Sequence, residues 1–219
     1  MESIQLSDRL ISFLMFIPVF LLSLTVHELA HALVAYKKGD NTAKDAGRLT
    51  VNPIKHLDLV GSVMMPFISF ASGLLLIGWA KPVPVNRANF KNPFKDDALV
   101  SFAGPLSNFI LAIIFALILS LVYNFQLTSS GLLINLIWYG VFFNIFLFAF
   151  NLLPIPPLDG SHILFDLFPN RLTAKYLSIG FYGTILLLLF IYSPLWGYFF
   201  GVVNYIIKML MIFTGLPVD

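Results

Sequence analysis

The chain has 219 residues, of which 58% are hydrophobic and 11% are charged, and its formal net charge is +2. A soluble domain carries about a quarter charged residues, so this composition excludes an ordinary soluble protein, and the small charge gives no indication of nucleic-acid binding. The chain has no cysteine, which excludes disulfides, thiolate metal ligands and cysteine nucleophiles. Several apolar stretches reach the length of about 20 residues that crosses a bilayer, so we expect one polytopic membrane-embedded domain over residues 1–219.

The first apolar stretch, residues 10–36, contains the sequence HELAH at residues 27–31. In a helix, His27 and His31 lie one turn apart on the same face, so their imidazole nitrogens can meet at one metal ion. Glu28 lies beside them on the helix surface. This pattern on a helix is typical of zinc hydrolases in which the glutamate is the general base. It also occurs on ordinary surface helices, but ionisable groups at membrane depth are usually functional.

The position of the two histidines within this stretch indicates where the reaction takes place. With a rise of 1.5 Å per residue, they lie about 8–14 Å from the helix end at Tyr36. We therefore expect hydrolysis inside the membrane, with water reaching the site through a polar cavity. Residues 1–8 lack the basic start and the cleavage site of a removable signal peptide, so the stretch is expected to be retained.

A second apolar stretch, residues 59–79, is interrupted by Pro66, Gly73 and Gly78. Basic loops at residues 37–55 and 81–97 flank it, and both are expected on the cytoplasmic side. This arrangement requires a re-entrant segment, which is tolerated where protein shields the backbone. The alternative is that the stretch simply crosses the membrane, because its length suffices.

The sequence Pro82-Val83-Pro84-Val85 follows in the second basic loop and predicts an extended strand. Its prolines remove N–H donors from one edge only, so Val83 and Val85 can still pair on the other edge. An unwound substrate can add to this edge as a further strand, which makes residues 82–85 candidate substrate-binding residues. The alternative is a structural β-hairpin.

The remaining apolar stretches complete an all-α polytopic membrane protein. We expect about five transmembrane helices, one re-entrant segment and a short β-hairpin. The core covers residues 10–168, and C-terminal helices occupy residues 175–214. The stretches that follow the second basic loop are residues 98–124, 132–153, 177–192 and 197–213.

A third metal ligand has to come from beyond the first stretch. The chain has only two glutamates, Glu2 and Glu28, so no downstream glutamate can serve. Asp159 is the best placed residue, because it follows a proline-rich run that cannot be regular helix. Gly160 lets the backbone turn beside it. This sequence can also be an ordinary turn, but with a ligand missing we favour Asp159 as the third ligand.

Two asparagines are candidates for contact with substrate. Asn151 ends the stretch 132–153, where its amide can donate to a developing oxyanion or to the helix end. Asn108 lies one turn after Gly104-Pro105, where small residues permit close helix approach. It is a candidate for substrate binding, although an interhelical hydrogen bond explains it better.

The other two histidines and one aspartate have less specific signals. His56 and Asp58 lie in a polar loop, where they can line the water path or belong to a solvated turn. His162 is close to Asp159 and can support it from outside the ligand set. It can equally be a loop histidine, so the roles of His56 and His162 stay open.

Together these stretches resemble the site-2 protease family of intramembrane zinc metalloproteases, and in particular its small members without a PDZ or CBS domain. The resemblance implies one zinc ion per chain on His27, His31 and Asp159, with Glu28 activating water. It also implies that Asn151 holds the substrate or the oxyanion. The matching stretches are residues 27–31, 52–58, 78–86, 103–108 and 151–160.

The expected function is therefore that of a zinc endopeptidase that cuts transmembrane segments of other proteins. Its partners are a transmembrane protein substrate and the lipid bilayer, and its location is the cell membrane, with the active site near the cytoplasmic face. The alternative is a catalytically silent metal-binding regulator or a transporter. A transporter is expected to show repeats around a midplane site, and the sequence shows none. Neither the substrate nor the oligomeric state follows from the sequence.

Overall fold

The computed structural model describes residues 2–72 and 78–217, and most of these are helical, as expected. Four helices of the described part are long and apolar enough to cross a membrane, against about five predicted. They are α1 (Glu2–Lys37, with its apolar part at Leu10–Lys37), α4 (Pro93–Asn124), α5 (Gly131–Asn151) and α9 (Leu195–Phe213). The sequence placed these helices to within a few residues, except that α1 and α4 begin earlier than their apolar stretches.

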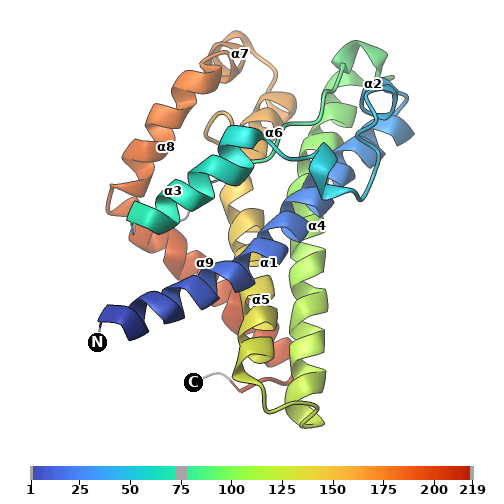
Figure 1. Cartoon of the computed structure of the whole chain (residues 1–219). Coiled ribbons are helices and arrows are strands. Elements are labelled where there is room, and N and C mark those ends of the chain that lie inside the picture. Colours follow the sequence, from blue (N-terminus) through green and yellow to red (C-terminus); the bar gives the residue numbers. More distant parts are fainter. Residues whose placement is uncertain (1, 73–77, 218–219) are drawn as a thin grey trace.

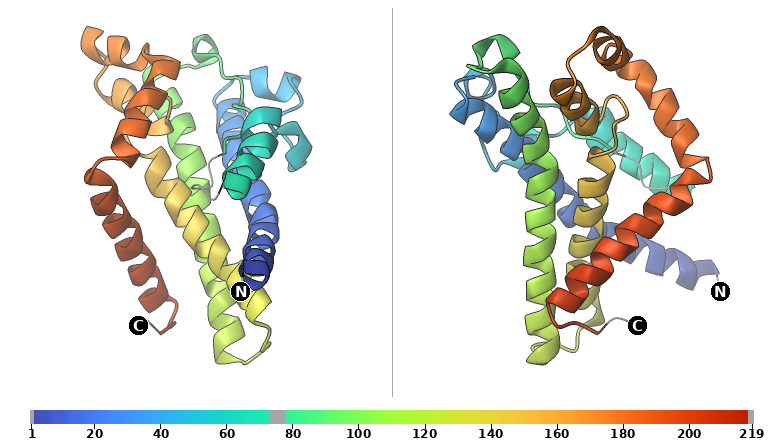
Figure 2. Two further views of the ribbon diagram at one scale, coloured as in Figure 1. Left: turned by 60° about the vertical axis from the view of Figure 1, so that its left-hand side comes forward. Right: turned by 180° about the vertical axis from the view of Figure 1, so that it is seen from behind.

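The helices α1, α4 and α5 form the centre of the molecule (Figure 1). The helix α4 packs against both α5 and α1, and α1 crosses the pair obliquely. Figure 2 shows α9 beside α5, on the side away from α1. Small residues on α4, Ala112 and Ala116, are fully buried against Val141 and Ile145 of α5 and Val203 of α9. Small side chains let apolar helices approach closely where no water is present to drive them together.

The stretch 59–79 folds back on itself. It forms a π-helix, η2 (Leu59–Met64), that continues into α3 (Met65–Ser72). After residues 73–77, which include Gly73 and lie outside the described part, the chain has returned to its starting point. The backbone N–H of Trp79 donates to the carbonyl oxygen of Gly61 over 3.1 Å, and Ser62 Oγ donates to the Trp79 carbonyl over 2.7 Å. The two ends of the stretch therefore lie together, as a re-entrant segment requires.

The predicted β-hairpin is not confirmed. Within the described ranges, the only β-type pairing is one isolated antiparallel bridge, between Leu57 and Ala80. Residues 81–86 have no assigned secondary structure and do not form a ladder. The next N–H on the same edge as that of Lys81 belongs to Val83, and it donates to Glu28 Oε2 instead, so pairing does not continue past the bridge.

The C-terminal stretch 177–192 is divided rather than one helix. It contains the end of α7 (Arg171–Leu177), the short helix η4 (Gly180–Tyr182) and α8 (Gly183–Ile191). With nine residues, α8 is about 14 Å long, which is too short to span a hydrocarbon core of about 30 Å. A methyl group on Gly183 would overlap the Pro156 carbonyl, so α8 begins in close contact with the turn before α6 (Asp159–Leu167).

Polar side chains fix the segment 81–89 against the ends of the long helices. The fully buried Asp40 accepts hydrogen bonds from the Asn86 backbone over 2.8 Å and from the Asn89 side chain over 2.7 Å. Arg87 pairs with Asp97 of α4 and with Asp166 of α6. The short helices of this region are α2 (Thr42–Asp45), η1 (Pro53–Lys55) and η3 (Arg87–Asn89).

Candidate metal centre

Three side chains converge where α1 meets the start of α6. The Nε2 atoms of His27 and His31 are 3.0 Å apart. The carboxylate of Asp159 lies 3.2 Å from His27 Nε2 through Oδ2 and 3.5 Å from His31 Nε2 through Oδ1. Among the described residues, this group alone brings three such ligand atoms within 4.8 Å of one another. The structure therefore brings together the three residues that the sequence selected as metal ligands.

The turn after α5 delivers Asp159 to this position. The helix α5 ends at Asn151, and the proline-rich run turns the chain so that α6 begins at Asp159. A methyl group on Gly160 would overlap the carbonyl oxygens of Leu152 and Leu153. A residue without a side chain is thus required there for Asp159 to reach α1.

Each histidine has a second hydrogen-bond partner on the side away from Asp159. His31 Nδ1 is 2.7 Å from the Val100 carbonyl oxygen, and His27 Nδ1 is 2.6 Å from Asn108 Oδ1. A carbonyl oxygen only accepts, so His31 Nδ1 donates and its Nε2 keeps a lone pair for a metal. Outer partners of this kind orient histidine ligands and fix which nitrogen binds.

The position of Asn108 does not support substrate contact. Its side chain is fully buried between α1, α4 and α5 and lies behind His27, and the residue is not among those that line the cavity at the site. Its amide nitrogen donates to the Ser23 carbonyl over 3.2 Å and to Asn144 Oδ1 over 2.9 Å. These are the interhelical hydrogen bonds that the sequence already favoured for this residue.

Glu28 lies beside the three ligands without joining them. Its Oε2 accepts a hydrogen bond of 2.9 Å from the backbone N–H of Val83. Glu28 therefore fixes the extended segment 82–85 next to the ligands, and its other carboxylate oxygen can take a proton. One of the two N–H groups that were expected to pair with substrate is occupied by this contact.

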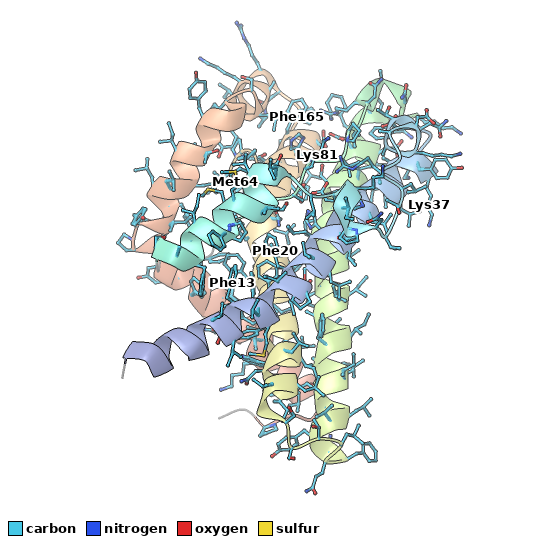
Figure 3. The ribbon with its side chains drawn as sticks, viewed as in Figure 1. Phe13, Phe20, Lys37, Met64, Lys81 and Phe165 are labelled. Atoms are coloured by element: carbon cyan, nitrogen blue, oxygen red, sulfur yellow. The ribbon has the colours of Figure 1, made fainter. Side chains whose placement is uncertain are left out.

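The site opens into a cavity of about 630 Å³ between α1, α5 and α8. Most of its wall is apolar, with side chains such as Phe20 of α1, Phe146 of α5 and Leu187 of α8. Figure 3 shows Phe20 on the side of α1 that faces α3. The polar residues in the wall include the three ligand candidates together with Glu28, Asn151, His162 and Asp97. A cavity with apolar walls and a few convergent polar groups at one end is typical of ligand-binding sites.

The ligand set fits zinc. Two imidazole nitrogens and one carboxylate oxygen are a common set for catalytic zinc, which keeps a further position open for water or substrate. The Oδ2 atom of Asp159 is buried and accepts no hydrogen bond from the described residues, which is costly unless a cation is bound there.

The other polar residues highlighted by the sequence are divided between cavity and loop. His162 and Asn151 line the cavity, and the Asn151 amide nitrogen donates to the Leu147 carbonyl over 3.0 Å. His56 is buried and contacts the Thr50 carbonyl through Nε2 over 2.8 Å. Asp58 accepts from the Gly61 N–H and caps η2, as a turn residue does.

Gly104 is part of the site, and its role was missed in the sequence. The sequence indicated close helix approach there, but not that the approaching groups are the imidazoles. A methyl group on Gly104 would overlap the ring of His31 and lie 2.7 Å from His27 Cε1. Both rings are held from behind by Asn108 and Val100, so they have little freedom to move away.

We expect Gly104→Ala to lower zinc affinity by at least about 10-fold, comparable with loss of an outer hydrogen-bond partner. Competition with a chelator measures this. Gly201→Ala in α9 is the matched control, because the added methyl group has no atom of a described residue within 4 Å. Wild-type zinc affinity in Gly104→Ala would show that the imidazoles do not need this space.

Comparison with known proteins points to one family. A family model described as Peptidase family M50 matches residues 15–191. The chain is 48% identical over 184 residues to the protein named "Putative zinc metalloprotease YwhC" of Bacillus subtilis, covering 81% of this chain and 80% of that protein. It is 33% identical over 207 residues to "Putative zinc metalloprotease Rip2" of Mycobacterium tuberculosis, covering 90% and 74%. It is 41% identical over 73 residues to "Putative zinc metalloprotease MJ0611" of Methanocaldococcus jannaschii, covering 32% and 34%. No solved structure gives a significant match.

Proposed function

The chain belongs to peptidase family M50 and is a zinc metalloprotease, and from this we propose that it cuts peptide bonds in or near transmembrane segments of other proteins. The proposal places one zinc on His27, His31 and Asp159. The observation that carries it is the convergence of these side chains at an apolar cavity between membrane-length helices.

Zinc, when bound, supplies a Lewis acid that polarises the scissile carbonyl and lowers the pKa of water. Glu28 takes a proton from the attacking water as the new C–O bond forms, and it then passes that proton to the nitrogen of the leaving amine as the amide C–N bond breaks. The Val83 N–H holds the Glu28 carboxylate in place through Oε2. Asn151 is proposed to donate its second amide N–H to the oxyanion, because the first is used by Leu147.

The substrate proposal rests on the walls of the cavity. Side chains such as Phe20, Phe146 and Leu187 offer no hydrogen bonds, so they suit an apolar segment. A helix shields its peptide bonds, and the substrate must therefore be extended at the cut. We propose that residues 82–85 pair with this extended part by β-augmentation. Since the Val83 N–H is donated to Glu28, that pairing depends on the backbone groups around Val85.

We propose that the protein lies in the cell membrane with the site near the cytoplasmic face. Lys37 and Lys81, from the two basic loops, lie toward the same end of the molecule (Figure 3). The loop between α4 and α5 lies at the other end (Figure 1). An excess of lysine and arginine marks cytoplasmic loops, so the lysine-bearing end is assigned to the cytoplasm.

Single cysteines test this topology without background, because the chain has no cysteine of its own. We expect an impermeant thiol reagent to label the variants Lys44→Cys, Lys91→Cys and Asn170→Cys only from the cytoplasmic side. The reagent should label Ser129→Cys only from outside. All four positions are exposed. Labelling of position 91 from outside would mean that residues 59–79 cross the membrane.

Comparison of membrane-protein fragments in cells tests the substrate class. Cells with the wild-type chain should accumulate fragments cut in or next to transmembrane segments, and cells with Glu28→Gln should not. Identical fragment sets in both cell types would count against a membrane-protein substrate and favour a catalytically silent regulator.

A further inference from the structure

We propose that Asn144 of α5 is a positioning residue for His27, which it orients through the amide of Asn108. The inference rests on the proposed metal site, and it concerns a residue that contacts neither the metal nor the cavity. Asn144 is fully buried, as are Asn108 and Ser23, its partners on α4 and α1. These side chains join the three central helices directly behind the imidazole of His27.

The hydrogen bonds of Asn144 fix the direction of its own amide. Its Nδ2 lies 2.8 Å from the Gly140 carbonyl oxygen and 2.9 Å from Ser23 Oγ. The carbonyl of Gly140 can only accept, so the Asn144 NH₂ group must face it. The Oδ1 atom of Asn144 therefore faces α4, where it is 2.9 Å from Asn108 Nδ2.

The direction of the Asn108 amide follows from this contact. Its NH₂ group has two acceptors, Asn144 Oδ1 at 2.9 Å and the Ser23 carbonyl at 3.2 Å. If the amide were reversed, Asn108 Oδ1 would face two oxygens instead. Asn108 Oδ1 is thus directed to His27 Nδ1, at 2.6 Å, and that nitrogen must donate. The Nε2 atom of His27 is then free to bind a metal, with the ring held at a fixed angle.

The surroundings make this arrangement rigid. All three side chains lie within helices of membrane length, where water is not at hand to replace a lost partner. A half-satisfied polar group in such a place is unfavourable, and a fully connected network has one stable arrangement. His31 gives an internal comparison, because its Nδ1 is held by the Val100 carbonyl and does not depend on Asn144.

Replacement of Asn144 by leucine keeps the branching of the side chain at Cγ and removes the acceptor. We expect zinc affinity to fall by about 10-fold, at the low end of the 10–100-fold typical of outer partners, since the Ser23 carbonyl still holds the amide. Asn108→Ala should lower affinity more. In the Asn108→Ala background, Asn144→Leu should have no further effect, because it acts through Asn108. Ser120→Ala is the matched control, as it removes a buried hydrogen bond to the Thr214 carbonyl far from His27.

A second measurement needs neither activity nor bound zinc. Nitrogen NMR of the four labelled histidines in the zinc-free protein shows which ring nitrogens carry a proton. We expect a protonated Nδ1 on both His27 and His31 in the wild type. In Asn144→Leu, the Nδ1 signal of His27 should move toward the unprotonated form while that of His31 stays unchanged.

The possible results separate this inference from the proposed function. An unprotonated His27 Nδ1 in the wild type would overturn it even if Asn144→Leu did not fold. Wild-type zinc affinity in Asn144→Leu would also overturn it. So would an equal loss of zinc affinity when Asn144→Leu is made in the wild type and in Asn108→Ala. Absence of peptide cleavage would contradict the proposed function only, since neither measurement here depends on cleavage.

Discussion

Replacement of Glu28 by glutamine is expected to abolish peptide hydrolysis while the protein stays folded and binds zinc. The amide oxygen of glutamine can still accept the Val83 N–H, so segment 82–85 keeps its place. The ligand atoms of His27, His31 and Asp159 are not altered. What is lost is the base that moves the proton from water to the leaving amine, a contribution of about 10²–10⁴-fold. The rate on a fluorescent transmembrane peptide, with zinc quantified in each sample, measures the effect.

Asn151→Ala provides a comparison at the same site. It should retain zinc and a measurable rate, because one oxyanion donor contributes roughly 10²–10³-fold. At equal zinc content, Glu28→Gln should therefore lower the cleavage rate more than Asn151→Ala does. Full activity in zinc-loaded Glu28→Gln would defeat the protease assignment of this site and leave a metal-binding role without hydrolysis.

Replacement of Asp159 by alanine is expected to remove most of the zinc. Two imidazoles remain, and a zinc site of this kind requires three protein ligands. The loss of affinity should exceed the 10–100-fold that follows loss of an outer hydrogen-bond partner, because a direct ligand is removed. Elemental analysis of the purified variant, after dialysis against a weak chelator, measures the zinc content.

Asp45→Ala serves as the control for Asp159→Ala. Asp45 is exposed in α2 and lies outside the ligand group, so the zinc content of Asp45→Ala should equal that of the wild type. Undiminished zinc in Asp159→Ala would mean that His56, His162 or another aspartate completes the site. Because His162 lines the same cavity, it would be the first of these to replace.

The convergence of the three proposed metal ligands could be predicted from the sequence because its signals are local. His27 and His31 share a helix face through the helical repeat, and Asp159 was the best placed of the candidates that remained once glutamate was excluded. The structure brings these three side chains together as expected. Helix positions were also predictable, since apolar stretches near 20 residues specify them with little reference to the rest of the chain.

The surroundings of the ligands could not be predicted in the same way. His27 meets Asn108 across 81 positions of sequence, and Val83 meets Glu28 across 55. No periodicity links such residues, and the contacts depend on how closely α4 approaches α1 at Gly104. Asn144 gave no signal at all, because one asparagine in an apolar helix has many candidate partners. The close approach of Gly183 to Pro156, at the start of α8, likewise joins distant parts of the sequence.

The most direct test of the account is to determine where the purified, zinc-loaded protein cuts a peptide that contains a transmembrane segment. The masses of the products identify the bond. The account predicts a cut inside or at the edge of the apolar segment, and no products from Glu28→Gln with the same zinc content. Cleavage confined to soluble, unstructured peptides, or product masses unchanged by Glu28→Gln, would contradict it.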